Sequence, residues 1–129
     1  MEKLIIGIIV IVGLINFYPV VGILSSEILF NLYKIDSISN DVLILLKHRA
    51  ILFGFLGGFI IYSAFKPELQ IWGIILGLAS MLPFIVIALF TGNYGVGIQK
   101  VIVADVIASI GLIIALALRL LFIKSGNAL

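Results

Sequence analysis

The chain of 129 residues is too apolar to cover a water-soluble core. Apolar residues make up 64% of it and charged residues 11%, and its mean hydropathy is +1.39, so polar side chains are too few to surround such a core. The net charge of +2 comes from residues scattered along the chain, which excludes the basic face that binds nucleic acid. Because there is no cysteine and one histidine, disulfides, thiolate metal sites and multi-histidine metal or haem sites within one chain are excluded, and we expect no cofactor.

We expect an all-α integral membrane protein, a four-helix bundle with antiparallel up-down topology that forms a single transmembrane domain over residues 1–129. A membrane-spanning helix needs about 20 apolar residues. The sequence holds four such stretches, at about 4–24, 43–65, 69–90 and 98–123. The first stretch exceeds the apolar part of a signal peptide, so we expect it to remain in the mature protein. Pro19 near its end predicts a bend around Ile15.

A short amphipathic helix is predicted between the first and second spans, at residues 25–35. Its apolar side chains recur at helical spacing, and its polar side chains occupy the other side. Such a pattern is typical of a segment that lies flat on the membrane surface or over the end of a bundle. The helix after it begins near Ser39 or Asn40, either of which can cap it.

The second span has a charged end and an apolar end. Lys47, His48 and Arg49 fall within one turn, and no charge follows until Lys66. The connection that starts at Lys66 is short, so we expect the third span to run antiparallel to the second and to pack beside it. The glycine-rich run at residues 91–97 predicts a loop before the fourth span.

Small residues recur at four-residue spacing along the last three spans, as at Gly54 and Gly58 or at Gly73 and Gly77. Ridges of this kind let helices approach one another closely. They serve either packing within one bundle or the seam of a homodimer.

If the spans are antiparallel, most polar residues lie in the same half of the membrane. The end of the first span, the start of the second, the end of the third and the start of the fourth lie on one side, and polar side chains gather there. The candidate ligand-binding residues in this half are Asn16, His48, Arg49, Asn93, Tyr94 and Asp105. The opposite half is nearly all hydrocarbon, and we expect Arg119 there to extend to the membrane interface.

Arg49 and Asp105 are the charged residues that we expect inside the hydrophobic layer. A charge at the centre of a span costs about 2.5 to 3.5 kcal/mol, so one arrangement pairs Arg49 with Asp105 across the bundle. In the alternative, Arg49 and Lys47 reach lipid headgroups while Asp105 pairs with Lys100 or is protonated. His48, the one side chain of a type that titrates near neutral pH, is a surface histidine or a proton carrier.

Three runs of the sequence resemble small four-helix membrane proteins of the DoxX-like group. They are LYKIDSISNDVLILLKHRAILFGFLGGF at 32–59, LGLASMLPF at 76–84 and KVIVADVIASIGL at 100–112. The resemblance covers nearly the whole chain and marks Arg49 and Asp105 as family-like positions. It implies a multi-pass protein of the bacterial inner (cytoplasmic) membrane with both termini cytoplasmic, an orientation that the evenly divided Lys and Arg residues do not decide. Some DoxX-like proteins are membrane subunits of quinone-linked or redox complexes.

The sequence contains no recognisable catalytic motif, so we expect a protein that is not an enzyme. The first hypothesis is an accessory or small-molecule-binding bundle whose polar half holds a membrane lipid, a quinone-like molecule or another amphiphile, with a homodimer or a membrane complex as its setting. The second is a small proton-coupled transporter acting as a dimer. Small multidrug-resistance proteins of that kind carry a buried glutamate in the first span, where this chain has Asn16. A third is a membrane enzyme that uses His48 and Asp105 as base and orienting acid.

Overall fold

The structure is a computed structural model that describes residues 1–23 and 39–124. The elements in this part of the chain are α1 (Glu2–Phe17), the 3-10 helix η1 (Tyr18–Ile23), α3 (Asn40–Ala64), the 3-10 helix η2 (Pro67–Leu69), α4 (Gln70–Thr91) and α5 (Val96–Lys124). Four of the described segments are helical, long and apolar enough to cross a membrane. The prediction of an all-helical protein with four apolar helices is therefore confirmed. The amphipathic helix predicted at 25–35 lies outside the described residues.

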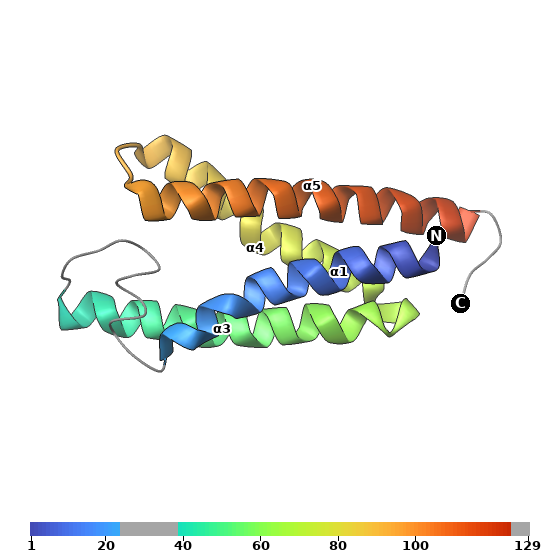
Figure 1. The fold of residues 1–129 in the computed structure, drawn as a ribbon, viewed down its shortest axis with the longest axis horizontal. Helices are drawn as coiled ribbons and strands as arrows, with labels where there is room; N and C mark the ends of the chain where they lie inside the picture. Colours follow the sequence, from blue (N-terminus) through green and yellow to red (C-terminus); the bar gives the residue numbers. More distant parts are fainter. Residues whose placement is uncertain (24–38, 125–129) are drawn as a thin grey trace.

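The four long helices pack together, with a smaller direct contact between α1 and α4 across the bundle. α1 packs against α3 and α5, and α4 packs against the same two helices. Figure 1 shows α1 and α4 running in one direction and α3 and α5 in the other. The start of α1, the connection η2 and the end of α5 lie together at what we call the η2 end. The end of α1, η1 and the starts of α3 and α5 lie at the opposite end, which we call the η1 end.

Proline sets the end of α1. Because Pro19 has no N–H group, the carbonyl of Ile15 cannot accept the regular helical hydrogen bond from the residue four positions later. The α-helix ends at Phe17, and the chain continues as the 3-10 helix η1. The bend predicted around Ile15 stays a prediction, and the first α-helix is shorter than the predicted span.

The other helix boundaries follow from side-chain capping and from turn residues. Ser39 caps α3, because its Oγ accepts a 3.2 Å hydrogen bond from the backbone N–H of Val42. Gly92 and Asn93 end α4 with φ angles of 66° and 54°, a left-handed conformation that glycine and asparagine adopt more readily than other residues. The loop predicted at 91–97 is thus confined to the few residues between α4 and α5.

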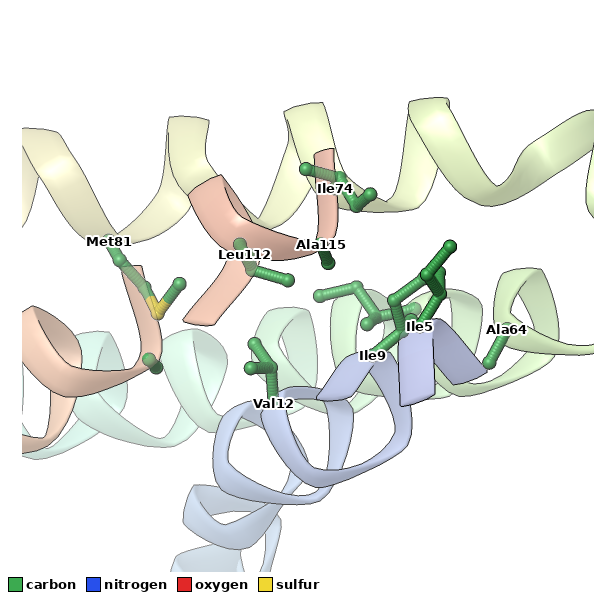
Figure 2. Close-up of a cluster of buried hydrophobic side chains, with 10 residues drawn as sticks. Ile5, Ile9, Val12, Ala64, Ile74, Met81, Leu112 and Ala115 are labelled. Atoms are coloured by element: carbon green, nitrogen blue, oxygen red, sulfur yellow. The ribbon is translucent and has the colours of Figure 1, made fainter. Parts of the chain in front are cut away.

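The apolar core receives side chains from all four helices. Its buried members are Ile5, Ile9, Val12, Ile60, Ala64, Ile74, Met81, Ala108, Leu112 and Ala115. Within each helix they recur three, four or seven residues apart, which places them on one face. Figure 2 shows these side chains pointing toward one another between the helices. They come from the half of the bundle next to the η2 end and from its middle.

Glycine lets α1 and α3 approach backbone to backbone. A Cβ atom on Gly57 would lie 2.6 Å from the nitrogen of Phe17 and 2.7 Å from the carbonyl oxygen of Gly13, so a side chain there meets backbone atoms that cannot give way. Of the predicted row, Gly54 lies against η1, whereas a Cβ on Gly58 would have no neighbour within 4 Å. The glycine of α3 that contacts α1 is therefore Gly57, which is not part of the predicted row of Gly54 and Gly58.

Arg119 is buried at the η2 end, and its extension to the membrane interface stays a prediction. Its side chain is 5% exposed, and Nη2 donates a 3.1 Å hydrogen bond to the Pro67 carbonyl. Its guanidinium also lies 5.8 Å from the ring centroid of Phe122. Its burial follows from helical spacing, because Arg119 shares a face of α5 with the core residues Leu112 and Ala115.

Candidate ligand-binding cavity

A cavity of about 480 Å³ lies at the η1 end, between α1, η1, α3 and α5. The residues that line it are Leu14, Ile15, Asn16, Tyr18, Pro19, Arg49, Phe53, Gly97, Lys100, Val101, Ala104 and Asp105. Most of its wall is apolar, with a few polar groups among the hydrocarbon. Small-molecule sites typically have volumes of about 300 to 1,000 Å³ and this kind of wall. The cavity therefore has the size and the lining of a ligand site.

Asn16 brings a buried amide from α1 to the cavity. Its side chain is 4% exposed, and Nδ2 donates a 3.0 Å hydrogen bond to the carbonyl of Val12, one turn earlier. The same nitrogen lies 3.8 Å from the Sδ atom of Met81 in α4. These contacts fix the rotation of the amide. Asn16 points inward because it follows the core residues Ile9 and Val12 on the same helical face.

Arg49 lies between two aromatic rings on the cavity wall. Its Cζ atom is 4.9 Å from the ring centroid of Phe53, one turn later in α3, and 4.9 Å from that of Phe84 in α4. Cation–π contacts contribute about 0.5 to 2 kcal/mol each. Both contacts place the guanidinium charge over the face of an aromatic ring. The rings thus position a planar donor group at the cavity.

α5 supplies the third side of the cavity with residues at helical spacing, including Val101 and Asp105. Asp105 is partly buried, and the positive charge of Arg49 acts on it electrostatically. Lys100 adds a second cationic side chain, which is exposed. The structure thus places Arg49 and Asp105 around one cavity, as the sequence suggested. Their direct ion pair stays a prediction.

The other candidate residues do not line this cavity. His48 precedes Arg49 in α3 but its side chain is exposed, and Asn93 is exposed in the connection between α4 and α5. Tyr94 lines a second cavity, of about 230 Å³, between α4 and the start of α5. The structure therefore gathers Asn16, Arg49 and Asp105 and leaves the remaining candidates elsewhere at the η1 end. Ligand binding by each of the six stays a prediction.

The predicted site omitted residues that line the cavity or contact Arg49. Phe53 follows Arg49 by four residues, a spacing that puts both on one helical face and that signals their contact. Phe84 has no such signal, because its contact with Arg49 depends on how α3 and α4 pack. Lys100 entered the sequence analysis as an alternative partner for Asp105, without a place in the site.

The chemistry available at the cavity is that of charge pairing and hydrogen bonding beside hydrocarbon. Arg49 and Lys100 attract an anionic group, and Asp105 attracts a cationic one. Among the described residues, no group of three or more His, Asp or Glu side chains has a geometry that could hold a metal ion. The arrangement suits recognition of a polar group that is attached to an apolar one.

No family model, no curated protein and no solved structure matches this chain in comparisons with known proteins. The resemblance to DoxX-like proteins therefore rests on the quoted sequence runs and stays a prediction.

Proposed function

We propose that this chain is an integral membrane protein that binds an amphiphile, a membrane lipid or a quinone-like molecule, in the cavity at the η1 end. The observation that carries the proposal is the composition of the cavity wall, where Asn16, Arg49 and Asp105 lie beside apolar side chains such as Val101. A ligand that fits such a wall has a polar head and an apolar body. In this proposal the protein acts by binding, as an accessory protein, and catalyses no reaction.

The continuity between the cavity and the outer surface supports an amphiphile as the ligand. Leu14 and Ile15 line the cavity and are also 56% and 36% exposed. The apolar wall of the cavity therefore continues onto the outer face of α1. In a bilayer, an amphiphile places its polar head among the charged groups and its apolar chain along this face, where it contacts hydrocarbon on both sides.

The proposed setting is the bacterial inner (cytoplasmic) membrane, crossed by an antiparallel up-down bundle with both termini cytoplasmic. The length and apolarity of the described helices support a membrane location, and the sequence resemblance to DoxX-like proteins supports the membrane and the orientation. The cavity at the η1 end then belongs to the outer leaflet. We propose that the protein binds the amphiphile as a homodimer or as part of a larger membrane complex.

The substitution Ala104→Phe tests the proposal by filling the cavity. Ala104 lines the cavity, whereas Ala117 is an exposed alanine on the same helix outside it. Ala117→Phe is therefore a matched control that adds the same ring elsewhere. Each protein is purified in mild detergent and incubated with membrane lipids and ubiquinone, and the bound amphiphile is measured by native mass spectrometry.

The wild-type protein and Ala117→Phe are expected to keep one bound amphiphile through washing, and Ala104→Phe is expected to lose it. Equal retention by all three proteins would mean that the amphiphile sits on the outer surface, and the proposal would be wrong. A wild-type protein that retains no amphiphile would also contradict it. Circular dichroism of each variant shows that the comparison is made on folded protein.

A further inference from the structure

The second cavity, of about 230 Å³, lies between the end of α4 and the start of α5. We call the cavity proposed to bind an amphiphile the first cavity. The side chains that line the second cavity belong to Phe84, Ile87, Ala88 and Ile98, which are apolar, and to Thr91 and Tyr94. Of the residues that the structure describes, no charged one lines it. A charged molecule would lose its hydration there without gaining a partner of opposite charge, so the second cavity suits an uncharged, apolar ligand.

The size of the second cavity matches a small ring. An apolar protein cavity of about 150 Å³ is large enough to bind benzene, and the second cavity is larger. Two of its lining residues, Phe84 and Tyr94, are aromatic, and aromatic rings pack favourably against one another. Thr91 and Tyr94 carry hydroxyl groups, which can donate to or accept from one polar substituent. The matching ligand is therefore an uncharged single ring that carries a hydroxyl group.

α4 contacts the polar residues of the first cavity although it does not line that cavity. In the described part of the chain, all lining residues of the first cavity come from α1, η1, α3 and α5. Sδ of Met81 in α4 lies 3.8 Å from Nδ2 of Asn16. The ring centroid of Phe84 lies 4.9 Å from Cζ of Arg49. Met81 and Phe84 are three residues apart, which places them on one side of α4.

Phe84 connects the two cavities. It lines the second cavity, and its ring contacts Arg49, which lines the first. The connection holds whatever other partners Arg49 has, because it depends on the contact between the guanidinium and the ring alone. A molecule that fills the second cavity thus packs against a side chain that itself packs against the wall of the first.

This connection makes binding in one cavity favour binding in the other. An aromatic ring on a cavity wall has fewer packing contacts on the cavity side, and a bound molecule supplies contacts that restrict the motion of the ring. Arg49 lies against the ring of Phe84, so its motion is restricted as well. The entropy of ordering both side chains is lost when the first ligand binds. The second ligand then binds more tightly, because that loss is not repeated.

We propose that the second cavity binds an uncharged single-ring molecule with a hydroxyl group, and that Phe84 couples this binding to the amphiphile in the first cavity. The coupling rests on the proposed function of the first cavity. Because coupling between two binding sites is reciprocal, each ligand raises the affinity for the other by the same factor. Phe84 is a positioning residue in this account, since it acts on the amphiphile through Arg49.

The first experiment tests the second cavity without any amphiphile, with benzyl alcohol as the probe. The chain has no cysteine, so Thr91→Cys places a single thiol at this cavity. Benzyl alcohol is expected to slow its reaction with N-ethylmaleimide severalfold and in a saturable way. Val96→Cys is the matched control, because Val96 is 64% exposed at the start of α5 and lines neither cavity. Its rate is expected to stay constant.

Two results would overturn the second site. One is equal rates of Thr91→Cys with and without benzyl alcohol, or equal slowing of Thr91→Cys and Val96→Cys. The other is equal protection by benzylamine, which has the same ring but is a cation at neutral pH, because it would show that the site does not select an uncharged ligand.

The second experiment measures the coupling with the ring held in place. A benzyl thiosulfonate reagent attaches a benzyl group to Thr91→Cys through a disulfide, and native mass spectrometry then measures the affinity for phosphatidylethanolamine. Attachment is expected to raise this affinity about fivefold or more. The same group on Val96→Cys is expected to leave it unchanged. Phe84→Leu in the Thr91→Cys protein is expected to abolish the increase, and Phe84→Tyr, which keeps the ring, to retain it.

Failure of the coupling is distinguishable from failure of the proposed function. If attachment at Thr91→Cys leaves the lipid affinity unchanged or lowers it, while Ala104→Phe still abolishes lipid binding, the coupling is wrong and the proposed function stands. The same holds if Phe84→Leu keeps the full increase. If Ala104→Phe does not abolish lipid binding, the proposed function and the coupling both fall, and protection by benzyl alcohol still decides the second site. Each variant is compared with and without the benzyl group, so a common loss of stability does not affect the result.

Discussion

Gly57 of α3 faces Gly13 of α1 at a distance that leaves no room for a side chain between them. A Cβ atom on Gly57 would lie 2.7 Å from the Gly13 carbonyl oxygen and 2.6 Å from the Phe17 nitrogen. Both are backbone atoms, so relief requires the helices to separate. This contact sets the spacing of α1 and α3 next to the cavity, because Leu14, the residue after Gly13, already lines the cavity.

Gly57→Ala is therefore expected to destabilise the protein by about 1 to 3 kcal/mol, the usual effect of overpacking. Gly58→Ala is the matched control, because its Cβ would meet no atom within 4 Å. Alanine favours a helix over glycine by about 1 kcal/mol, so Gly58→Ala is expected to be neutral or stabilising. Thermal unfolding in detergent measures both. Equal melting temperatures for the two variants would show that α1 and α3 are not in close contact.

The helices could be predicted from the sequence because their signal is local. Apolar stretches of membrane-spanning length identify α3, α4 and α5 to within a few residues, as the predicted span 43–65 and the observed helix Asn40–Ala64 illustrate. Pro19 marks the end of a helix because it has no N–H group, and Ser39 marks the start of one because its hydroxyl can cap the first turn. The end of α1 was less certain, because proline bends some helices and ends others.

The register between helices could not be predicted in the same way. Successive helix residues are turned by about 100°, so Gly57 faces α1 whereas a Cβ on Gly58 would meet no atom within 4 Å, although the four-residue spacing in the sequence selected Gly58. Arg49 and Asp105 were found because a charge within a span is unfavourable unless it has a function or a partner. The contact of Arg49 with Phe84 and the burial of Arg119 depend on tertiary packing, for which a single sequence carries no signal.

The buried Arg119 offers a second prediction about stability. Its Nη2 donates to the Pro67 carbonyl, but its Nε has no partner among the described residues. The Pro67 carbonyl also accepts the backbone N–H of Gln70, so it stays satisfied without the arginine. Arg119→Met is therefore expected to be neutral or stabilising, as apolar replacements of buried charges often are. Arg119→Ala is expected to lower stability by about 2 kcal/mol or more, because it leaves a void.

Melting temperatures in detergent compare the two Arg119 variants. If the methionine variant were as unstable as the alanine variant, the charge of Arg119 and not its volume would stabilise the η2 end. The hydrogen bond to the Pro67 carbonyl and the contact with the Phe122 ring would then be the source of that stability.

A double-mutant cycle tests whether Arg49 and Asp105 act as a pair. Arg49→Ala and Asp105→Ala are each expected to lower the melting temperature, because each removes the electrostatic attraction between the two charges in a partly buried place. The double variant is expected to be more stable than the sum of the single losses predicts, by about 1 kcal/mol or more. Arg49→Ala combined with Glu68→Ala is the control, since Glu68 is exposed at the η2 end, and these losses are expected to add. Additive losses for Arg49 and Asp105 as well would show that the two residues act independently.

The proposed orientation predicts which end of the bundle faces the cell exterior. The chain has no cysteine, so a single introduced thiol reports its own position. Asn93 and Lys66 are exposed in connections at the η1 and η2 ends. With cytoplasmic termini, an impermeant thiol reagent on intact cells is expected to label Asn93→Cys and not Lys66→Cys. Labelling of Lys66→Cys alone would reverse the orientation.

The most direct test of ligand binding in the cavity is to locate a bound lipid by photo-cross-linking. A phosphatidylethanolamine with a diazirine near its head group is added to the purified protein in lipid nanodiscs and irradiated, and the modified residues are identified by mass spectrometry. Binding in the cavity predicts that modification is concentrated on the lining residues Leu14, Phe53 and Val101, and that excess unlabelled phosphatidylethanolamine suppresses it. Modification spread evenly over exposed residues such as Ile107 and Ile113, with no suppression, would contradict a lipid site in this cavity.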